Sequence, residues 1–193
     1  MTLDYRMEVR RKAVHLIGLA FLAVFWSLGR TTALWIIGVW FAAESCIEAA
    51  RLRSPAFNRR VLDLFPGIHR EHETRQVSGI FWTTLGCWLT LYGFGDRPHV
   101  AEAALLYQVF GDLAAALVGK AFGRRRIGIG FKTIEGSLGC FAACLLCGFA
   151  AGLRGGAPWA GAAAATLLEL LPLPFNDNLW LPLGSAFALW CVI

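Results

Sequence analysis

The chain has 193 residues, of which 57% are hydrophobic and 16% are charged, and its formal net charge is +5. Soluble domains carry about 25% charged residues, so the composition argues against a soluble domain and predicts one integral membrane domain over residues 1–193. The positive charge does not predict a nucleic-acid partner, because Lys and Arg in so apolar a chain mark membrane topology or an anionic ligand.

Seven apolar segments follow one another and predict an all-α, polytopic membrane protein with about seven transmembrane helices. A helix needs about 20 apolar residues, and at least about 17, to cross a bilayer. The segments run roughly over 13–29, 32–50, 78–95, 100–122, 135–153, 158–172 and 178–193. The sixth is short, and it or the seventh could be incomplete. Between the second and third, FNRRVLDLFPGI has apolar residues at helical spacing and predicts a short amphipathic helix.

The basic residues lie mostly on one side of these segments. Fifteen of the 18 Lys and Arg residues lie before the first segment, between the second and third, or around the end of the fourth. Only Arg30, Arg97 and Arg154 fall on the other side. Because cytoplasmic loops are enriched in Lys and Arg, we predict a cytoplasmic N-terminus and, with seven crossings, an external C-terminus.

Asp112 is the strongest polar signal, because it stands inside the fourth apolar segment. A carboxylate there costs about 2.5–3.5 kcal/mol on insertion scales, so it should face a cavity or a partner. Gly111, Ala115 and Gly119 recur near it at helical spacing, and such small residues allow another backbone or a flat ligand to come close. We interpret Asp112 as a metal-binding or catalytic carboxylate. A buried ion pair with a basic residue of another span is the alternative.

A basic turn follows this segment. The run Arg124–Arg126 and Lys132 are separated by glycines, a combination that suits a phosphate, although the arginines could simply hold the loop inside. Thr133 can cap the next helix, and Glu135 would stand in its first turn. This helix start would expose backbone N–H groups beside Lys132, which is a favourable arrangement for an anion.

Two further polar positions have open interpretations. Asn176, Asp177 and Asn178 precede the last segment and offer the hard oxygen ligands that Mg²⁺ prefers, but they could equally form a plain helix cap. His15 lies one turn into the first segment. It could be a base, a phosphate donor or a buried core histidine.

Taken in order, these motifs resemble the CTP-dependent lipid kinase family, which includes dolichol kinase, phytol kinase and the CTP-using diacylglycerol kinase. The residues that carry the resemblance are Arg11, Lys12 and His15; Arg70, Glu73, Ser78 and Gly79; Gly111, Asp112, Ala115, Val118, Gly119, Lys120 and Gly123; Lys132, Thr133, Glu135, Gly136 and Ser137; and Asp177, Asn178 and Pro182.

The resemblance implies CTP as phosphoryl donor, Mg²⁺ or another divalent cation as cofactor, and a membrane lipid alcohol as acceptor. The acceptor would be a polyprenol- or phytol-type isoprenoid or diacylglycerol. The chain is short beside dolichol kinase, which favours a small prokaryotic enzyme in the cytoplasmic membrane, with its active site facing the cytoplasm.

The residues and the resemblance together give the site that we expect. The catalytic residues are Asp112, Lys132, Glu135 and Asp177, with Asp112 and Asp177 on the metal. The nucleotide and phosphate ligands are Arg11, Lys12, Gly119, Lys120, Arg124, Arg125, Lys132, Thr133 and Ser137. The residues that contact the substrate or support the site are His15, Arg70, Glu73 and Asn178.

Two alternatives stay open. The family also resembles phosphatidate cytidylyltransferases, which would transfer a cytidylyl group to a lipid phosphate and release pyrophosphate instead of CDP. A transporter or scaffold for anionic lipids is the alternative of another class. The lack of an inverted sequence repeat and the gathering of polar motifs on one side count against it.

Overall fold

The computed structural model describes residues 15–64, 74–127 and 132–193. Four predicted site residues lie outside these ranges: Arg11, Lys12, Arg70 and Glu73. Within the described ranges the regular secondary structure is helical, apart from one isolated bridge between Arg126 and Thr133. The all-α prediction is therefore confirmed for the part of the chain that the structure describes.

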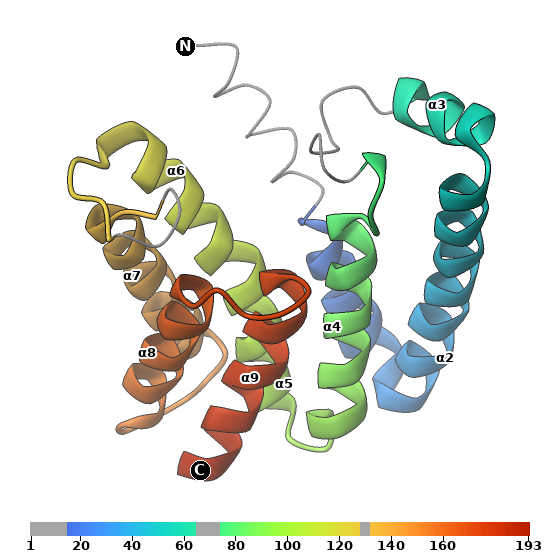
Figure 1. Ribbon diagram of the computed structural model, residues 1–193. Coiled ribbons are helices and arrows are strands. Elements are labelled where there is room, and N and C mark those ends of the chain that lie inside the picture. The colour runs from blue at the N-terminus through green and yellow to red at the C-terminus, as the bar shows by residue number, and fades with distance from the viewer. Residues whose placement is uncertain (1–14, 65–73, 128–131) are drawn as a thin grey trace.

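The helices match the predicted segments closely and alternate in direction (Figure 1). They are α2 (Ile17–Arg53), α3 (Pro55–Leu64), α4 (Gly79–Phe94), α5 (Pro98–Leu106), the π-helical turn η2 (Tyr107–Gly111), α6 (Asp112–Phe122), α7 (Ile134–Ala150), α8 (Ala157–Leu170) and α9 (Asp177–Val192). The short α3 confirms the helix predicted between the second and third segments.

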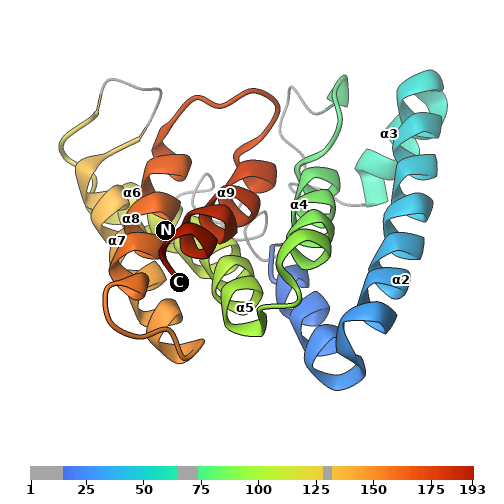
Figure 2. The ribbon, with the colours of Figure 1, turned by 90° about the horizontal axis from the view of Figure 1, so that it is seen from below.

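The first two predicted segments form one long helix with a sharp bend. Gly29 has φ 75° and ψ 169° inside α2, a conformation that glycine adopts readily because it has no Cβ. Arg30 fastens the bend to the end of α4, since its Nε donates to the Leu91 carbonyl at 3.2 Å and its Nη1 lies 3.1 Å from Asp96 Oδ1. The two arms of α2 therefore run in opposite directions (Figure 2).

Two apolar clusters hold the bundle together. One joins α5, α7, α8 and α9, with Tyr107 and Leu189 fully buried in it. The other joins both arms of α2 to α4 and α5, with Ile37 and Leu91 fully buried. The loops alternate between the two ends of this bundle. Figure 2 shows the described parts of the turn after α6 (123–127 and 132–133), residues 74–78 before α4 and the connection 171–176 at one end, which we call the polar end.

Helices α6 and α7 pack with their backbones close together. A Cβ on Gly136 would lie 2.8 Å from the Ala115 carbonyl oxygen, and a Cβ on Gly111 would lie 2.5 Å from Cys144 Sγ. The small-residue face that the sequence predicts around Asp112 therefore meets another backbone, which was one of its two predicted uses. Asp112 itself is one residue away from Gly111, about 100° around the helix, and points elsewhere.

Two described stretches are long and apolar enough to cross a membrane, namely Ile17–Arg53 and Pro98–Phe122. They suggest a membrane protein, but they are fewer than the roughly seven crossings predicted from the sequence. The difference arises because α2 is one stretch for two predicted segments, and because α4, α7, α8 and α9 have only 16, 17, 14 and 16 residues. At 1.5 Å per residue the four short helices reach about 21–26 Å, short of a hydrocarbon core of about 30 Å.

Candidate functional site at the polar end

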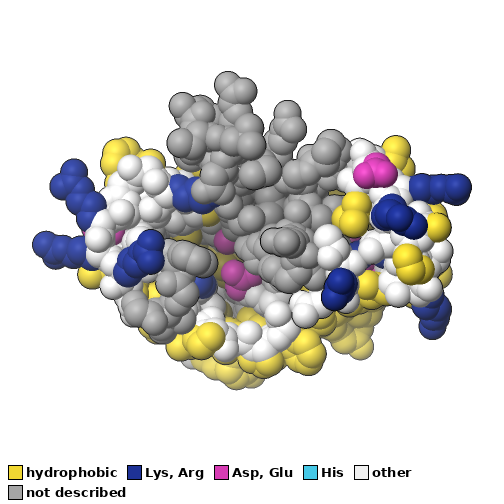
Figure 3. Space-filling model, turned by 45° about the horizontal axis from the view of Figure 1, so that its top comes forward, with side chains coloured by type: hydrophobic (Ala, Val, Ile, Leu, Met, Phe, Trp, Pro, Cys, Tyr) yellow, Lys and Arg dark blue, Asp and Glu magenta, His cyan; other side chains and the backbone are white. Residues whose placement is uncertain are grey.

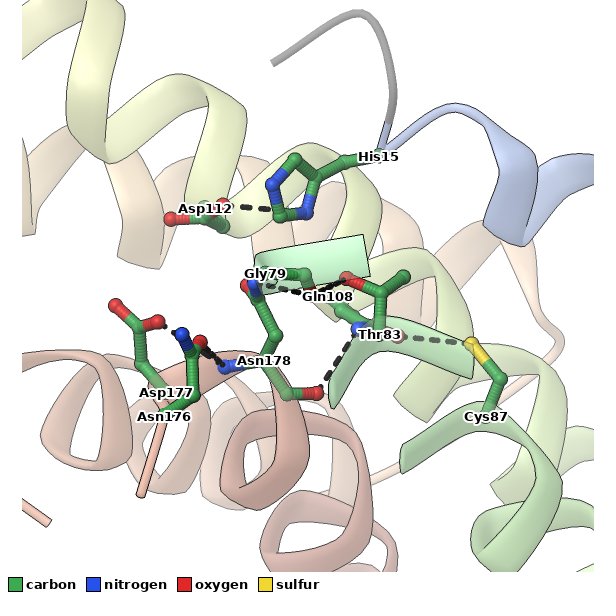
Figure 4. A network of polar contacts seen from close by, with 9 residues as sticks. All are labelled: His15, Gly79, Thr83, Cys87, Gln108, Asp112, Asn176, Asp177 and Asn178. Carbon is green, nitrogen blue, oxygen red and sulfur yellow. Dashed lines mark hydrogen bonds and ion pairs between the residues drawn. The ribbon is translucent and has the colours of Figure 1, made fainter. Parts of the chain in front are cut away.

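Acidic side chains from several helices gather at the polar end. Figure 3 looks onto this end and shows acidic groups in a hollow near the middle, with Lys and Arg toward the edge. Figure 4 shows Asp112 and His15 on one side of this region, with Asn176, Asp177 and Asn178 on the other. Residues that are more than 60 positions apart in sequence therefore meet at one place.

Asp112 is buried, with 4% of its surface exposed, and it is the first residue of α6. It directly follows η2, and π-helical turns of this kind occur frequently at functional sites because they widen one turn of a helix. His15 Nδ1 lies 3.8 Å from Asp112 Oδ2, which is beyond a direct hydrogen bond and within the range of electrostatic attraction. The buried carboxylate thus faces a histidine from the start of the chain's first described segment.

Lys132 and Glu169 form an ion pair that joins the start of α7 to the end of α8. The Nζ–Oε1 distance is 3.0 Å, and the side chains are 27% and 10% exposed. The carboxylates of Asp112 and Asp177 also act electrostatically on Glu169. Glu169 is therefore the point where the cation of Lys132 and the carboxylates of Asp112 and Asp177 act together. Glu169 is absent from the predicted site, and its only sequence signal is its nearness to Asn176.

Hydrogen bonds donated by backbone N–H groups hold the basic turn in place. The N–H groups of Arg124 and Arg125 donate to Glu135 Oε2 at 3.1 and 3.3 Å. Ile127 donates to the Lys132 carbonyl, and Ile134 N donates to the Arg125 carbonyl at 2.9 Å. Glu135, predicted to be catalytic, therefore fixes the turn to the start of α7. The side chains of Arg124 and Arg125 stay exposed to solvent.

The start of α7 has the predicted cap. Thr133 Oγ1 accepts a hydrogen bond from Gly136 N at 3.1 Å, which confirms Thr133 as the N-cap residue. Ser137 Oγ donates to the Thr133 carbonyl at 3.2 Å, and Gly119 packs against the Thr133 hydroxyl. Lys120 is exposed in the last turn of α6. The cap and the glycine contact place the basic turn beside α6.

At the start of α9, one residue of the predicted ligand cluster, Asn176, is a helix cap, which is the alternative to its being a metal ligand. Asn178 N donates to Asn176 Oδ1 at 3.0 Å and to Asp177 Oδ1 at 3.1 Å. Asn176 is the N-cap residue. Asp177 follows it in the first turn, half-exposed and facing the polar end (Figure 4).

Asn178 ties three elements together. Its Nδ2 donates to the Gly79 carbonyl at 3.3 Å, and its own carbonyl accepts from Gln108 Nε2 at 2.9 Å. Gln108, fully buried in η2, also lies 3.0 Å from Cys87 Sγ through its Oε1. The sequence gives little signal for Gln108 beyond a lone amide in an apolar run. Asn178 thus supports the site by fixing α9 against α4 and η2.

The residues present can supply part of a metal site. Among the described residues, no group of three or more His, Cys, Asp and Glu side chains is placed to hold a metal ion. Asp112 and Asp177 would therefore have to share a cation with a ligand. Mg²⁺ fits this condition, because it is commonly bound by one or two carboxylates together with waters and substrate phosphates.

Neither a family model, nor a curated protein, nor a solved structure matches this chain.

Proposed function

We propose that the protein is a kinase that uses CTP to phosphorylate the hydroxyl group of a membrane lipid alcohol. The observation that supports this function best is the meeting of Asp112, Asp177 and the Lys132–Glu169 pair at the polar end. Phosphoryl transfer depends mainly on positioning and charge neutralisation, and these residues provide both carboxylates for a cation and a cation for phosphate.

The membrane arrangement belongs to the same proposal. The bundle would cross the cytoplasmic membrane of a prokaryote about seven times, with the polar end in the cytoplasm. The described basic residues of the polar end outnumber Arg30, Arg97 and Arg154 at the other end, as the positive-inside rule requires. Large apolar side chains on the second arm of α2 are exposed, with Trp35 at 73% and Val39 at 67%. Tilt and local thinning of the bilayer accommodate short helices.

Each group then has a role. Asp112 and Asp177 would hold Mg²⁺, which would offset the charge of the triphosphate. Arg124, Arg125 and Lys132 would bind the phosphates, and Lys132 can do so while it stays near Glu169 because its ammonium group has three donors. A bond forms between the acceptor oxygen and the γ-phosphorus while the bond from that phosphorus to CDP breaks. The hydroxyl proton passes to one of the two aspartates.

The proposal is tested with purified protein in lipid, γ-labelled CTP and a panel of lipid alcohols. We expect labelled lipid phosphate and CDP from the wild type. Asp112→Asn should lower the rate by at least about 100-fold, the scale of a lost metal-binding or proton-accepting group. Glu102→Gln on α5 is the matched control, because it removes a carboxylate away from the polar end, and it should leave the rate unchanged.

Other outcomes decide against the proposal. Full transfer by the Asp112→Asn variant would remove this residue from the mechanism. Release of pyrophosphate with a lipid phosphate as acceptor would identify a cytidylyltransferase instead. Failure of the wild-type protein to bind any nucleotide, with or without Mg²⁺, would favour a lipid transporter or scaffold.

A further inference from the structure

A second polar group lies between α2 and α4, on the other face of α4 from the candidate site. Gly86 faces α9, since a Cβ there would lie 2.6 Å from the Asn178 carbonyl oxygen. Thr84 faces α2, where its hydroxyl lies beside the Glu44 carboxylate. Thr84 and Gly86 are two residues apart, which corresponds to a rotation of about 200° around the axis of an α-helix. The two polar regions therefore lie on opposite faces of α4.

One carboxylate of this second group is fully neutralised. Arg51 binds Glu48 through two hydrogen bonds, Nε to Oε1 at 2.7 Å and Nη2 to Oε2 at 2.6 Å. Ser78 N adds a third hydrogen bond to Glu48 Oε2 at 3.0 Å. Bidentate Arg–carboxylate pairs of this kind are strong and fixed in geometry. Glu48 therefore has its counter-charge within the same helix.

The next carboxylate, Glu44, lies one turn away, and within the described ranges it has no such counter-charge. Both carboxylate oxygens of Glu44 are buried, and neither has a hydrogen-bond partner among the described residues. The Thr84 hydroxyl is in the same condition, and Thr84 is completely buried. Thr84 lies beside Glu44 in looser geometry than a normal hydrogen bond. Buried polar atoms without partners are rare in folded proteins, because each one loses its hydration without replacement.

We propose that Glu44 and Thr84 bind a monovalent metal cation, Na⁺ or K⁺, between α2 and α4. Carboxylate and hydroxyl oxygens are hard donors of the kind that such cations take. The net charge of Glu44, Glu48 and Arg51 favours a monovalent cation over a divalent one. Glu48 is already balanced by Arg51, so one positive charge makes the group neutral, whereas a divalent ion would leave one buried charge unpaired.

The experiment measures the thermal stability of the purified full-length protein in NaCl, KCl and choline chloride at equal ionic strength. Binding to the folded state alone raises the Tm, and at 100 times the Kd we expect a rise of about 5–10 °C over choline for the bound cation. Glu44→Gln should give the same Tm in all three salts. Glu102→Gln, the matched control, should keep the wild-type dependence.

A second variant and a direct measurement keep the test decisive if Glu44→Gln folds poorly. Thr84→Val preserves the side-chain shape and should raise the cation concentration at half-effect by about 10-fold, as expected for the loss of one ligand worth about 1.4 kcal/mol. Radioactive Na⁺ should bind the wild-type protein and be displaced by unlabelled Na⁺ or K⁺, but not by choline.

The contrary results are also defined. A wild-type Tm that is equal in choline, Na⁺ and K⁺, without Na⁺ binding, would show that a protonated Glu44 needs no cation. Stabilisation by Mg²⁺ alone that is lost in Glu44→Gln would show a divalent site. Cation dependence that persists in Glu44→Gln would place the cation elsewhere. Each of these results overturns the proposal, and none of them bears on the kinase reaction.

Discussion

The two polar regions on either side of α4 are built in different ways. Between α2 and α4, Glu48 and Arg51 are three residues apart on one helix and form a local pair at 2.6 Å. At the polar end, Glu169 is paired with Lys132 and Asp112 faces His15, and these partners come from distant parts of the chain. A local pair needs only its own helix, whereas the long-range pairs exist only when the whole bundle is assembled.

The two kinds of pair suit different roles. A local, buried pair such as Glu48–Arg51 supports the fold, whereas a partly exposed pair such as Lys132–Glu169 can exchange one partner for a ligand. Arg51 is 1% exposed and its guanidinium also donates to the Gln76 carbonyl at 2.6 Å, so it has no room for a ligand. Lys132 is 27% exposed at the side chain and is paired with Glu169 at 3.0 Å. A phosphate can therefore reach Lys132 but not Arg51. Three measurements test this division.

The largest effect should come from removing the local pair. Arg51→Ala leaves Glu48, only 7% exposed, without its counter-charge. Breaking a buried ion pair on one side typically lowers the free energy of unfolding by about 3–5 kcal/mol. Thermal or denaturant unfolding of the purified protein measures this loss. Arg53→Ala, two residues further at an exposed position, is the matched control and should change stability by less than about 0.5 kcal/mol. Equal effects of the two variants would contradict a structural role for the Glu48–Arg51 pair.

An intermediate effect should come from disturbing the assembly on which the long-range pairs depend. In Gly136→Ala, the new methyl group would meet the Ala115 carbonyl oxygen at 2.8 Å, so α6 and α7 must move apart. Overpacking of this kind lowers the free energy of unfolding by about 1–3 kcal/mol. We also expect lower nucleotide affinity in a binding titration, because the basic turn moves with the start of α7.

Gly93→Ala is the control for this change. A Cβ at Gly93 in α4 would have no heavy atom within 4 Å, and alanine is about 0.5–1 kcal/mol better than glycine inside a helix. Gly93→Ala should therefore leave stability unchanged or raise it slightly. If Gly136→Ala behaved in the same way, the close contact between α6 and α7 would be disproved.

The smallest effect should come from the exchangeable pair itself. In a double-mutant cycle of Lys132→Met and Glu169→Gln, we expect a coupling energy of about 1 kcal/mol, near the upper end for pairs with solvent access. The Arg30–Asp96 pair is the control. Its distance is 3.1 Å, but Asp96 is 77% exposed, so its coupling should fall near about 0.2–0.5 kcal/mol.

The same variants sharpen the comparison when nucleotide binding is measured. Lys132→Met should weaken CTP binding whether or not Glu169 is present, whereas the Arg30 and Asp96 variants should not change it. A coupling energy of about 3 kcal/mol or more between Lys132 and Glu169 would show that the pair stabilises the fold and does not exchange Glu169 for a phosphate. Unaltered CTP binding by Lys132→Met would have the same meaning.

Much of the fold could be predicted, because it depends on patterns that are local in sequence. The break between the first two segments falls where Gly29 bends α2, and the cap at Thr133 is present as predicted. The pairing of Glu48 with Arg51 also follows from helical spacing. The number of membrane crossings was the weak point, since apolar length in the sequence counts residues that lie in loops, such as Leu171 after the end of α8.

The site was harder to predict because it depends on which helices are neighbours. Periodicity indicates that Asp112 must face something, but it does not identify His15 as the group it faces. The pairing of Lys132 with Glu169 requires the start of α7 to lie beside the end of α8, and Gln108 reaches Asn178 across 70 positions of sequence. Glu135 illustrates a related difficulty, because the structure shows it holding the turn through Arg124 N and Arg125 N, while its predicted catalytic role stays a prediction. Its place in the first turn of a helix fits a ligand role and a turn-holding role equally well.

The π-helical turn before Asp112 makes chain length, not residue type, the quantity that this part of the molecule must preserve. Helix α5 is oriented by its packing on α2 and α9, while α6 is oriented by its glycine contact with α7. Removing one residue from Tyr107–Gly111 would restore ordinary helical winding with little rotation of α5 against α6, because a π-helical turn holds one extra residue within about one turn. The deletion would remove the widened turn from which Gln108 reaches Asn178 and after which Asp112 follows. Substitutions within the turn can be absorbed by neighbouring side chains, but a deletion there would take the widened turn away from the site.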